Sequence, residues 1–233
     1  MKSAIILSEY AAVQGTEIVP DAKYPVTAYH LKKMLEDTGQ FSVGIVEEIF
    51  PRVLESDELF DLDLLVLNFP RHLCEHIPRL PDAQEQGFSR FVGSGKGVVA
   101  IHASNNAFPE CQAYKEILGG VWGKGSRIDF GPGRSFTVKI EDTMHPITKG
   151  MKDFAVDDEL YTGLDLASNV QVLASAFSQF SGSQEPVAWT QTYGDGRVFH
   201  NVLGHHPPST QNPDFIRLTV NGALWASTKE DTP

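Results

Sequence analysis

The sequence has 233 residues, of which 41% are hydrophobic and 21% charged, as in ordinary soluble globular proteins. It has 19 Lys and Arg residues against 30 Asp and Glu, a formal net charge of -11, and its scattered basic residues exclude the basic stripe that a nucleic acid requires. The opening MKSAIILSEY is too short an apolar run for a secretion signal or a membrane span, so we expect a cytoplasmic protein without a membrane partner. The two cysteines, Cys74 and Cys111, lack the spacing of a zinc knuckle or a disulfide framework.

Strand-like and helix-like segments alternate along the first half of the chain. Apolar or alternating runs predict strands at residues 4–7, 41–49, 62–67 and 98–101. Apolar residues at helical spacing predict helices at 29–35, before Gly39, and at 82–92. This alternation predicts βαβ units and a parallel sheet that helices cover on both faces.

The second half of the chain adds antiparallel strands and a last helix. A short helix is predicted at 109–118, and strands are predicted at 135–140 and 170–174. PVAWTQTYGDGRVFHNVLGHH places two strands around the turn 194–196, a strong hairpin signal. Apolar residues of 215–225 share one helical face. Without a repeat, a low-complexity tract or a linker, we predict one domain over residues 1–233.

Polar residues follow several predicted strands, at the positions where open α/β sheets bind ligands. These residues are Ser8-Glu9-Tyr10, Asn68 with Arg71 and His72, the segment 102–106, and Gly204-His205-His206. Several of these strand ends therefore carry an imidazole, which predicts a site at this edge of the sheet.

His102 ends the buried run GVVAI. A lone histidine there is compatible with a structural hydrogen bond to a loop carbonyl, but Ser104, Asn105 and Asn106 add donors and acceptors near a helix N-terminus, which favours a site. His205 is equally compatible with function and structure. His145 precedes a proline, which also suits a helix N-cap. Three other histidines fit surface or turn positions: His30, His76 and His206.

The run AVDDELYTG carries the acidic residues Asp157, Asp158 and Glu159. In an extended chain successive side chains alternate, so only one of Asp158 and Glu159 can face a pocket shared with the imidazoles. A carboxylate beside imidazoles suits proton transfer or metal binding. The spacing is not that of HExxH, and a divalent ion such as zinc stays open.

Two common site types do not fit the sequence. AIHAS has histidine where a nucleophile elbow carries serine or cysteine, which excludes a glutamine amidotransferase thiol. GSGKG precedes a strand instead of opening a helix, so we expect no nucleotide.

Several pieces of the chain together resemble the ThuA-like family, named for trehalose utilisation, whose fold is similar to class I glutamine amidotransferases. They are GVVAIHAS, YKEILGG, HPITKGM, DELY, PVAWTQTYGDGRVFHNVLGH and NGALWA, over about residues 60–227. The resemblance implies an α/β fold, a flavodoxin-like three-layer sandwich with a mostly parallel central sheet and an antiparallel edge. Its matching residues are His102, His145, Asp158, Glu159, Tyr161, Arg197, Gly204 and His205.

The resemblance also implies a role in bacterial disaccharide or glycoside catabolism, with a carbohydrate as the substrate. 3-Keto-sugars are among the candidate substrates. The leading hypothesis is a lyase, isomerase or hydrolase in which a histidine with a near-neutral pKa removes the acidic proton beside a keto group. Its expected catalytic residues are His102, Asp158, Glu159 and His205, and its expected substrate-binding residues are Ser104, Asn105, Tyr161, His145 and Arg197. The alternative is a non-catalytic carbohydrate-binding or regulatory protein. The tryptophans 122, 189 and 225 are predicted in the core, and a homo-oligomer is compatible with the sequence.

Overall fold

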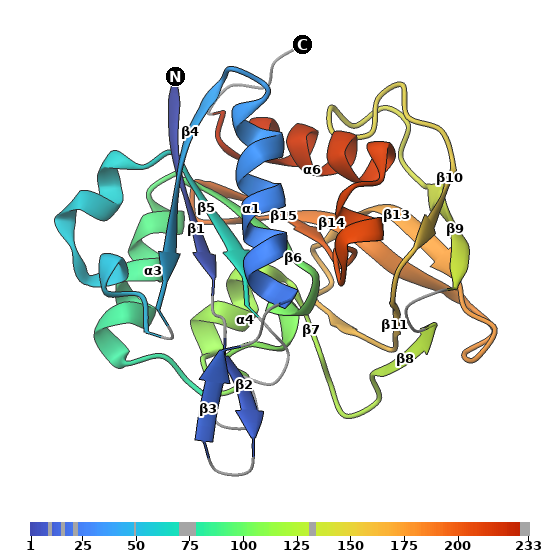
Figure 1. Ribbon diagram of the computed structural model, residues 1–233, viewed down its shortest axis with the longest axis horizontal. Coiled ribbons are helices and arrows are strands. Elements are labelled where there is room, and N and C mark those ends of the chain that lie inside the picture. Colours follow the sequence, from blue (N-terminus) through green and yellow to red (C-terminus); the bar gives the residue numbers. More distant parts are fainter. Residues whose placement is uncertain are drawn as a thin grey trace.

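Figure 1 shows the computed structural model of the chain, which describes residues 1–8, 11–14, 17–20, 23–48, 50–69, 78–130 and 134–228. A sheet of nine strands crosses the described part of the molecule in the order β10-β9-β13-β14-β15-β6-β5-β1-β4. Among the described residues, no helix combines the length and apolar character that crossing a membrane requires.

One half of this sheet is parallel. Its strands are β4 (Phe41–Glu47), β1 (Lys2–Ser8), β5 (Leu64–Asn68), β6 (Gly97–Ile101) and β15 (Gly196–Asn201). The helices are α1 (Lys23–Glu36), α3 (Asp82–Gly93), α4 (Gln112–Leu118), α5 (Pro207–Thr210) and α6 (Pro213–Ala226). Short 3-10 helices are η1 (Arg52–Glu55), η2 (Asp57–Asp61) and η3 (His102–Asn106).

The other half of the sheet is antiparallel. Its strands are β14 (Gln184–Tyr193), β13 (Gln171–Phe177), β9 (Ser135–Ile140) and β10 (Phe154–Asp157). Three two-stranded sheets join β2 (Ala11–Gln14) to β3 (Glu17–Pro20), β7 (Gly120–Val121) to β12 (Asp165–Leu166), and β8 (Arg127–Phe130) to β11 (Leu160–Thr162).

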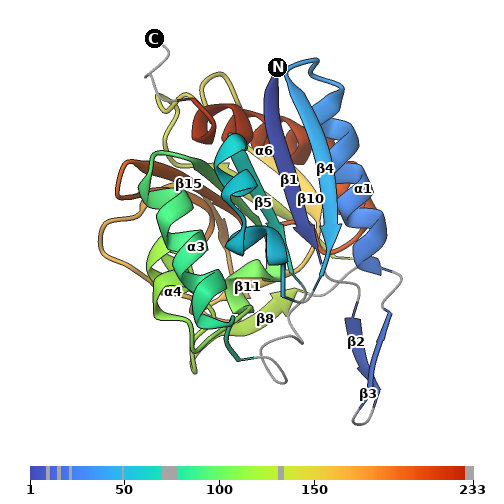
Figure 2. The same ribbon diagram turned by 90° about the vertical axis from the view of Figure 1, so that its left-hand side faces the viewer.

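Helices cover both faces of the parallel strands, as Figure 2 shows. Successive strand residues belong to different cores, because side chains alternate along a strand. Val99 and Ile101 of β6 pack with α1 and α6, whereas Val98 and Ala100 pack with α3 and α4. The continuous apolar runs in the sequence therefore reflect strands that are buried on both faces.

The structure confirms the predicted fold class, a flavodoxin-like α/β sandwich, and the predicted hairpin between β14 and β15. The antiparallel part is larger than an edge: four strand pairs are parallel and four are antiparallel. The helix predicted from residue 109 begins at Gln112, because Phe108 has a φ of 49° and its carbonyl accepts from the Cys111 amide in a turn.

The carboxyl ends of the parallel strands meet at one rim of the sheet. Ser8 ends β1 and Asn68 ends β5, and the Asn68 side-chain amide donates to Ser8 Oγ at 3.0 Å. His102 follows β6 directly, and the segment after β15 leads to His205. Six residues discussed from the sequence lie outside the described residues: Glu9, Tyr10, Arg71, His72, Cys74 and His76.

Candidate functional site

His102 stands at the turn between β6 and η3 with an unusual backbone conformation. Its φ is 48°, in the left-handed region, which costs a non-glycine residue roughly 1–2 kcal/mol. Its ring is buried, and Nδ1 lies 2.9 Å from the Val202 carbonyl oxygen. Because a carbonyl only accepts hydrogen bonds, Nδ1 carries a proton and the neutral ring has its lone pair on Nε2.

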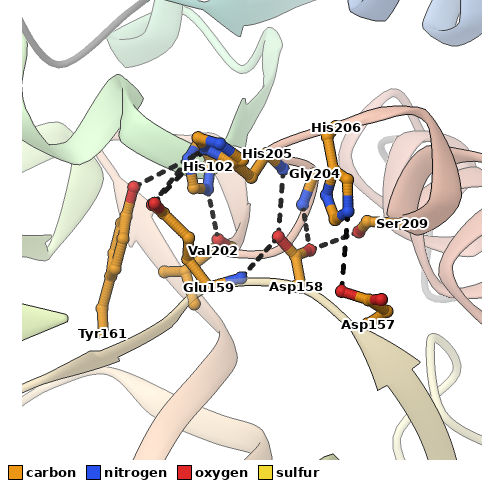
Figure 3. A network of polar contacts seen from close by, with 10 residues as sticks. All are labelled: His102, Asp157, Asp158, Glu159, Tyr161, Val202, Gly204, His205, His206 and Ser209. Carbon is orange, nitrogen blue, oxygen red and sulfur yellow. Dashed lines mark hydrogen bonds and ion pairs between the residues drawn. The ribbon is translucent and has the colours of Figure 1, made fainter. Parts of the chain in front are cut away.

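Three side chains from other elements meet this Nε2 atom, as Figure 3 shows. The Tyr161 hydroxyl lies 2.8 Å from it, His205 Nδ1 lies 3.2 Å from it, and Glu159 Oε2 lies 3.6 Å from it. Glu159 Oε2 is also 3.4 Å from His205 Nδ1. We call His102, Glu159, Tyr161 and His205 the His102 cluster.

Asp158 points away from this cluster and holds the segment that follows β15. Its carboxylate accepts hydrogen bonds from the backbone amides of Gly204 at 2.6 Å, His205 at 3.2 Å and Glu159 at 2.8 Å, and from the Ser209 hydroxyl. Burial raises the pKa of Asp158, although these hydrogen bonds oppose the rise. Of the two acidic residues left open by the sequence, Glu159 therefore faces the imidazoles, and Asp158 positions the His205 backbone.

Gly204 allows the chain to return over His102. Its φ is 115°, a value that side-chain-bearing residues rarely adopt, and a Cβ there would lie 3.0 Å from Ile101 Cγ2. Gly204 and the Asp158 hydrogen bonds together bring His205 next to His102, which lies 103 positions earlier in the chain.

Burial lowers the pKa of His102 from 6.5 to about 4, and the hydrogen bond to Val202 only partly opposes this shift. The ring is therefore neutral at pH 7. This differs from the near-neutral pKa that the sequence suggests, because an isolated strand end gives no measure of how completely later segments cover the ring.

A cavity of about 550 Å³ has Asn105 and Trp122 in its wall, but none of the four residues of the His102 cluster lines it. The Trp122 ring meets the Tyr161 ring edge to face at a centroid distance of 5.1 Å. The buried Asn105 amide has no hydrogen-bond partner for either polar atom among the described residues. Of the three tryptophans predicted in the core, Trp189 is fully buried, whereas Trp122 and Trp225 are partly buried and pack against the core.

The other predicted substrate-binding residues lie elsewhere. Ser104 ties η3 to β5, because its hydroxyl donates to the Leu67 carbonyl at 2.9 Å and accepts from the Phe69 amide at 3.0 Å. His145 and Arg197 lie around Trp225, with a centroid distance of 5.3 Å between the His145 and Trp225 rings and 5.2 Å from the guanidinium to the Trp225 ring.

We call His145, Arg197 and Trp225 the Trp225 cluster. Arg197 lies at the start of β15, and Val198 pairs with Val98 near the start of β6. His102 follows the far end of the same strand, so the two clusters lie at opposite ends of the parallel sheet. The structure therefore does not bring His145 or Arg197 to the His102 cluster.

Two contributors to the site were not predicted from the sequence. The Val202 carbonyl orients His102, but any residue supplies a carbonyl, so sequence carries no signal for it. Ser209 donates to Asp158 from α5, and its position after two prolines marks a helix start, the only available hint.

The described elements form an α/β three-layer fold with a cluster of buried polar side chains beyond the carboxyl ends of its parallel strands. The family model described as ThuA, trehalose utilisation, matches residues 12–226, and the chain belongs to this family. This description indicates a role in sugar metabolism. A comparison with curated proteins gives no match.

Solved structures show the same fold. A ThuA-like protein from Parabacteroides merdae is 23% identical over 100% of this chain and 92% of its own, with a TM-score of 0.80. A ThuA-like protein from Bacteroides uniformis is 17% identical over 99% of this chain and 93% of its own, with a TM-score of 0.74. A protein described as cytoplasmic, from Salmonella typhimurium, is 15% identical over 97% of this chain and 98% of its own, with a TM-score of 0.61.

Proposed function

We propose that the chain is an enzyme that processes a carbohydrate at the His102 cluster, with a keto-sugar derived from a disaccharide or glycoside as its substrate. The observation that carries this proposal is the convergence of two imidazoles, a carboxylate and a phenol at one rim of the sheet. A buried ring in a strained backbone conformation supports it, because such strain concentrates at functional sites.

The cavity lined by Asn105 and Trp122 suits a sugar ring. A pyranose presents hydroxyl groups around its edge and apolar C–H groups on its faces. The buried Asn105 amide offers a donor and an acceptor, and Trp122 offers an aromatic surface. The Trp122 ring, which lines the cavity, contacts the Tyr161 ring of the His102 cluster.

The cluster supports proton transfer next to a carbonyl group. Glu159 takes the proton from the carbon beside the keto group, and the C–H electron pair moves onto the carbonyl oxygen, where the Tyr161 hydroxyl stabilises the enolate. Return of the proton to the former carbonyl carbon, together with transfer of the hydroxyl proton of the adjacent carbon to the former carbonyl oxygen, gives an isomerase. Departure of a neighbouring alkoxide, which takes up a proton, gives a lyase. Without substrate, the neutral His102 ring accepts from the Tyr161 hydroxyl, which turns to the enolate oxygen when the substrate binds. His205 orients the Glu159 carboxylate.

The test uses NMR to measure the turnover of oxidised and unoxidised disaccharides by the full chain. Glu159→Gln should lower kcat/KM by at least about 100-fold, within the usual range for a lost acid or base. Asp157→Asn and His206→Gln are matched controls, because these residues form a neighbouring carboxylate–imidazole contact of 3.5 Å. Sugar binding without turnover would overturn the proposal and leave the carbohydrate-binding alternative.

A further inference from the structure

The donor atoms of the His102 cluster have the spacing of metal ligands. His102 Nε2, His205 Nδ1 and Glu159 Oε2 are separated by 3.2, 3.4 and 3.6 Å. Two ligands at zinc bond lengths of about 2.0–2.1 Å and a tetrahedral angle lie about 3.3 Å apart. The three atoms, which come from three different segments, can therefore surround one ion with little movement.

The surroundings of these atoms orient them as ligands. His102 donates its Nδ1 proton to the Val202 carbonyl, so that Nε2 presents its lone pair to Glu159 and His205. A histidine that binds a metal through one nitrogen typically makes such a hydrogen bond through the other. Asp158 accepts from the His205 and Glu159 backbone amides, which fixes the segments of both other ligands.

We propose that His102 Nε2, Glu159 and His205 Nδ1 bind one divalent first-row transition ion, with zinc as the preferred ion. Two imidazole nitrogens and one carboxylate suit Zn²⁺, Fe²⁺, Mn²⁺ or Co²⁺ better than Mg²⁺ or Ca²⁺, which prefer oxygen ligands. Three protein ligands leave a coordination position for water or a substrate oxygen, as in catalytic zinc sites.

This inference rests on the proposed function, because it assigns an ion to the same reacting centre. Such an ion would act as a Lewis acid toward the substrate oxygen, and Glu159 would serve as its ligand instead of as the base. By lowering the pKa of a nearby water, the ion would also supply the base that Glu159 no longer provides. The Tyr161 hydroxyl, 2.8 Å from His102 Nε2, gives up that hydrogen bond and lies beside the ion.

The test measures ion binding by the full, tag-free chain after treatment with a chelator and dialysis. Titration with Zn²⁺, measured by calorimetry and elemental analysis, should give one bound ion per chain. Mg²⁺ should not compete with Zn²⁺ for this site. His102→Ala, Glu159→Gln and His205→Ala should each weaken Zn²⁺ binding by at least about 100-fold, since even indirect contacts account for 10–100-fold. Circular dichroism checks that each variant folds.

Three variants serve as controls for a ligand role. His206→Gln and Asp157→Asn alter the neighbouring contact and should change Zn²⁺ affinity by less than about threefold. Tyr161→Phe removes the hydroxyl next to Nε2 and should keep or raise the Zn²⁺ affinity, because this hydroxyl competes for the lone pair. Binding of less than about one fifth of a zinc ion per chain would overturn the inference. Unchanged Zn²⁺ affinity in folded variants of the three ligand residues would overturn it as well.

The two proposals fail in different ways. Stoichiometric ion binding without turnover of any sugar supports the inference and overturns the proposed function. Turnover of a keto-sugar by the chelated chain, unaffected by added Zn²⁺, overturns the inference and leaves the proposed function with Glu159 as the base.

Discussion

The two ends of the parallel sheet carry similar residues in different surroundings. Each end has an imidazole, a charged group and an aromatic ring, and the resemblance to the family covers residues at both. At the His102 end the polar atoms are largely buried and point toward one another. At the Trp225 end His145 Nδ1 accepts from the Ile147 amide at 3.2 Å, which closes a local turn. Residue type does not distinguish these ends, whereas burial and convergence do.

An aspartate supports each end of the sheet. Replacement of the buried one, Asp158, gives the largest expected effect on stability. Asp158 is buried and accepts from Gly204, His205 and Ser209, so Asp158→Ala leaves buried donors without a partner. We expect a loss of about 3 kcal/mol or more in the free energy of unfolding, measured by urea denaturation.

Asp142 is the matched position at the other end. It accepts from the Met144 and His145 amides at 2.8 and 3.0 Å, but near the surface, where water replaces it. Asp142→Ala should cost at most about 1 kcal/mol, like an exposed cap. Equal losses for the two variants would show that burial does not distinguish the two ends.

The sequence predicts most of the fold, because its signals are local. The run GVVAI and the turn before Arg197 are each readable within about ten residues, and both define the expected strands. The small strands β7, β8, β11 and β12 were not predicted, since each has at most four residues and is defined by a distant partner.

The site is only partly predictable for the same reason. His102 and His205 are recognisable because each follows a strand of the parallel sheet, and such strands end at a common rim. The choice between Asp158 and Glu159 depends on the segment that follows β15, which offers backbone amides to Asp158. The separation of Arg197 from His102 depends on the pairing of β15 with β6.

Acidification should destabilise the protein through its buried imidazoles near the His102 end. Burial lowers the pKa of His102 to about 4 and that of His200 to about 3. In the unfolded chain, histidine side chains bind protons near pH 6.5. The stability that these buried neutral rings contribute is therefore complete above that pH and falls as the pH drops toward the folded pKa values. Between pH 7 and 5 each ring should account for about 2 kcal/mol.

His200→Phe tests this pH dependence, because the ring stacks on Trp189 with a centroid distance of 4.3 Å and a phenyl ring keeps that contact. Urea denaturation of chelated protein at pH 7 and 5 should show that the variant loses about half of the dependence that the two rings supply. His145→Gln, at the other end, should change it less, since that ring is only half-buried. An unchanged dependence in His200→Phe would contradict the linkage.

The smallest expected effect concerns Arg197, which, like His145 of the same Trp225 cluster, is expected from the sequence to bind substrate. Its guanidinium lies over the Trp225 ring, a contact that contributes about 0.5–1 kcal/mol at a partly exposed site. Arg197→Ala should lower the free energy of unfolding by that amount and leave sugar turnover and Zn²⁺ affinity unchanged, because β15 places it at the opposite end from His102. Loss of turnover by tenfold or more at unchanged stability would mean that the cavity of about 290 Å³ beside Trp225 takes part in the reaction.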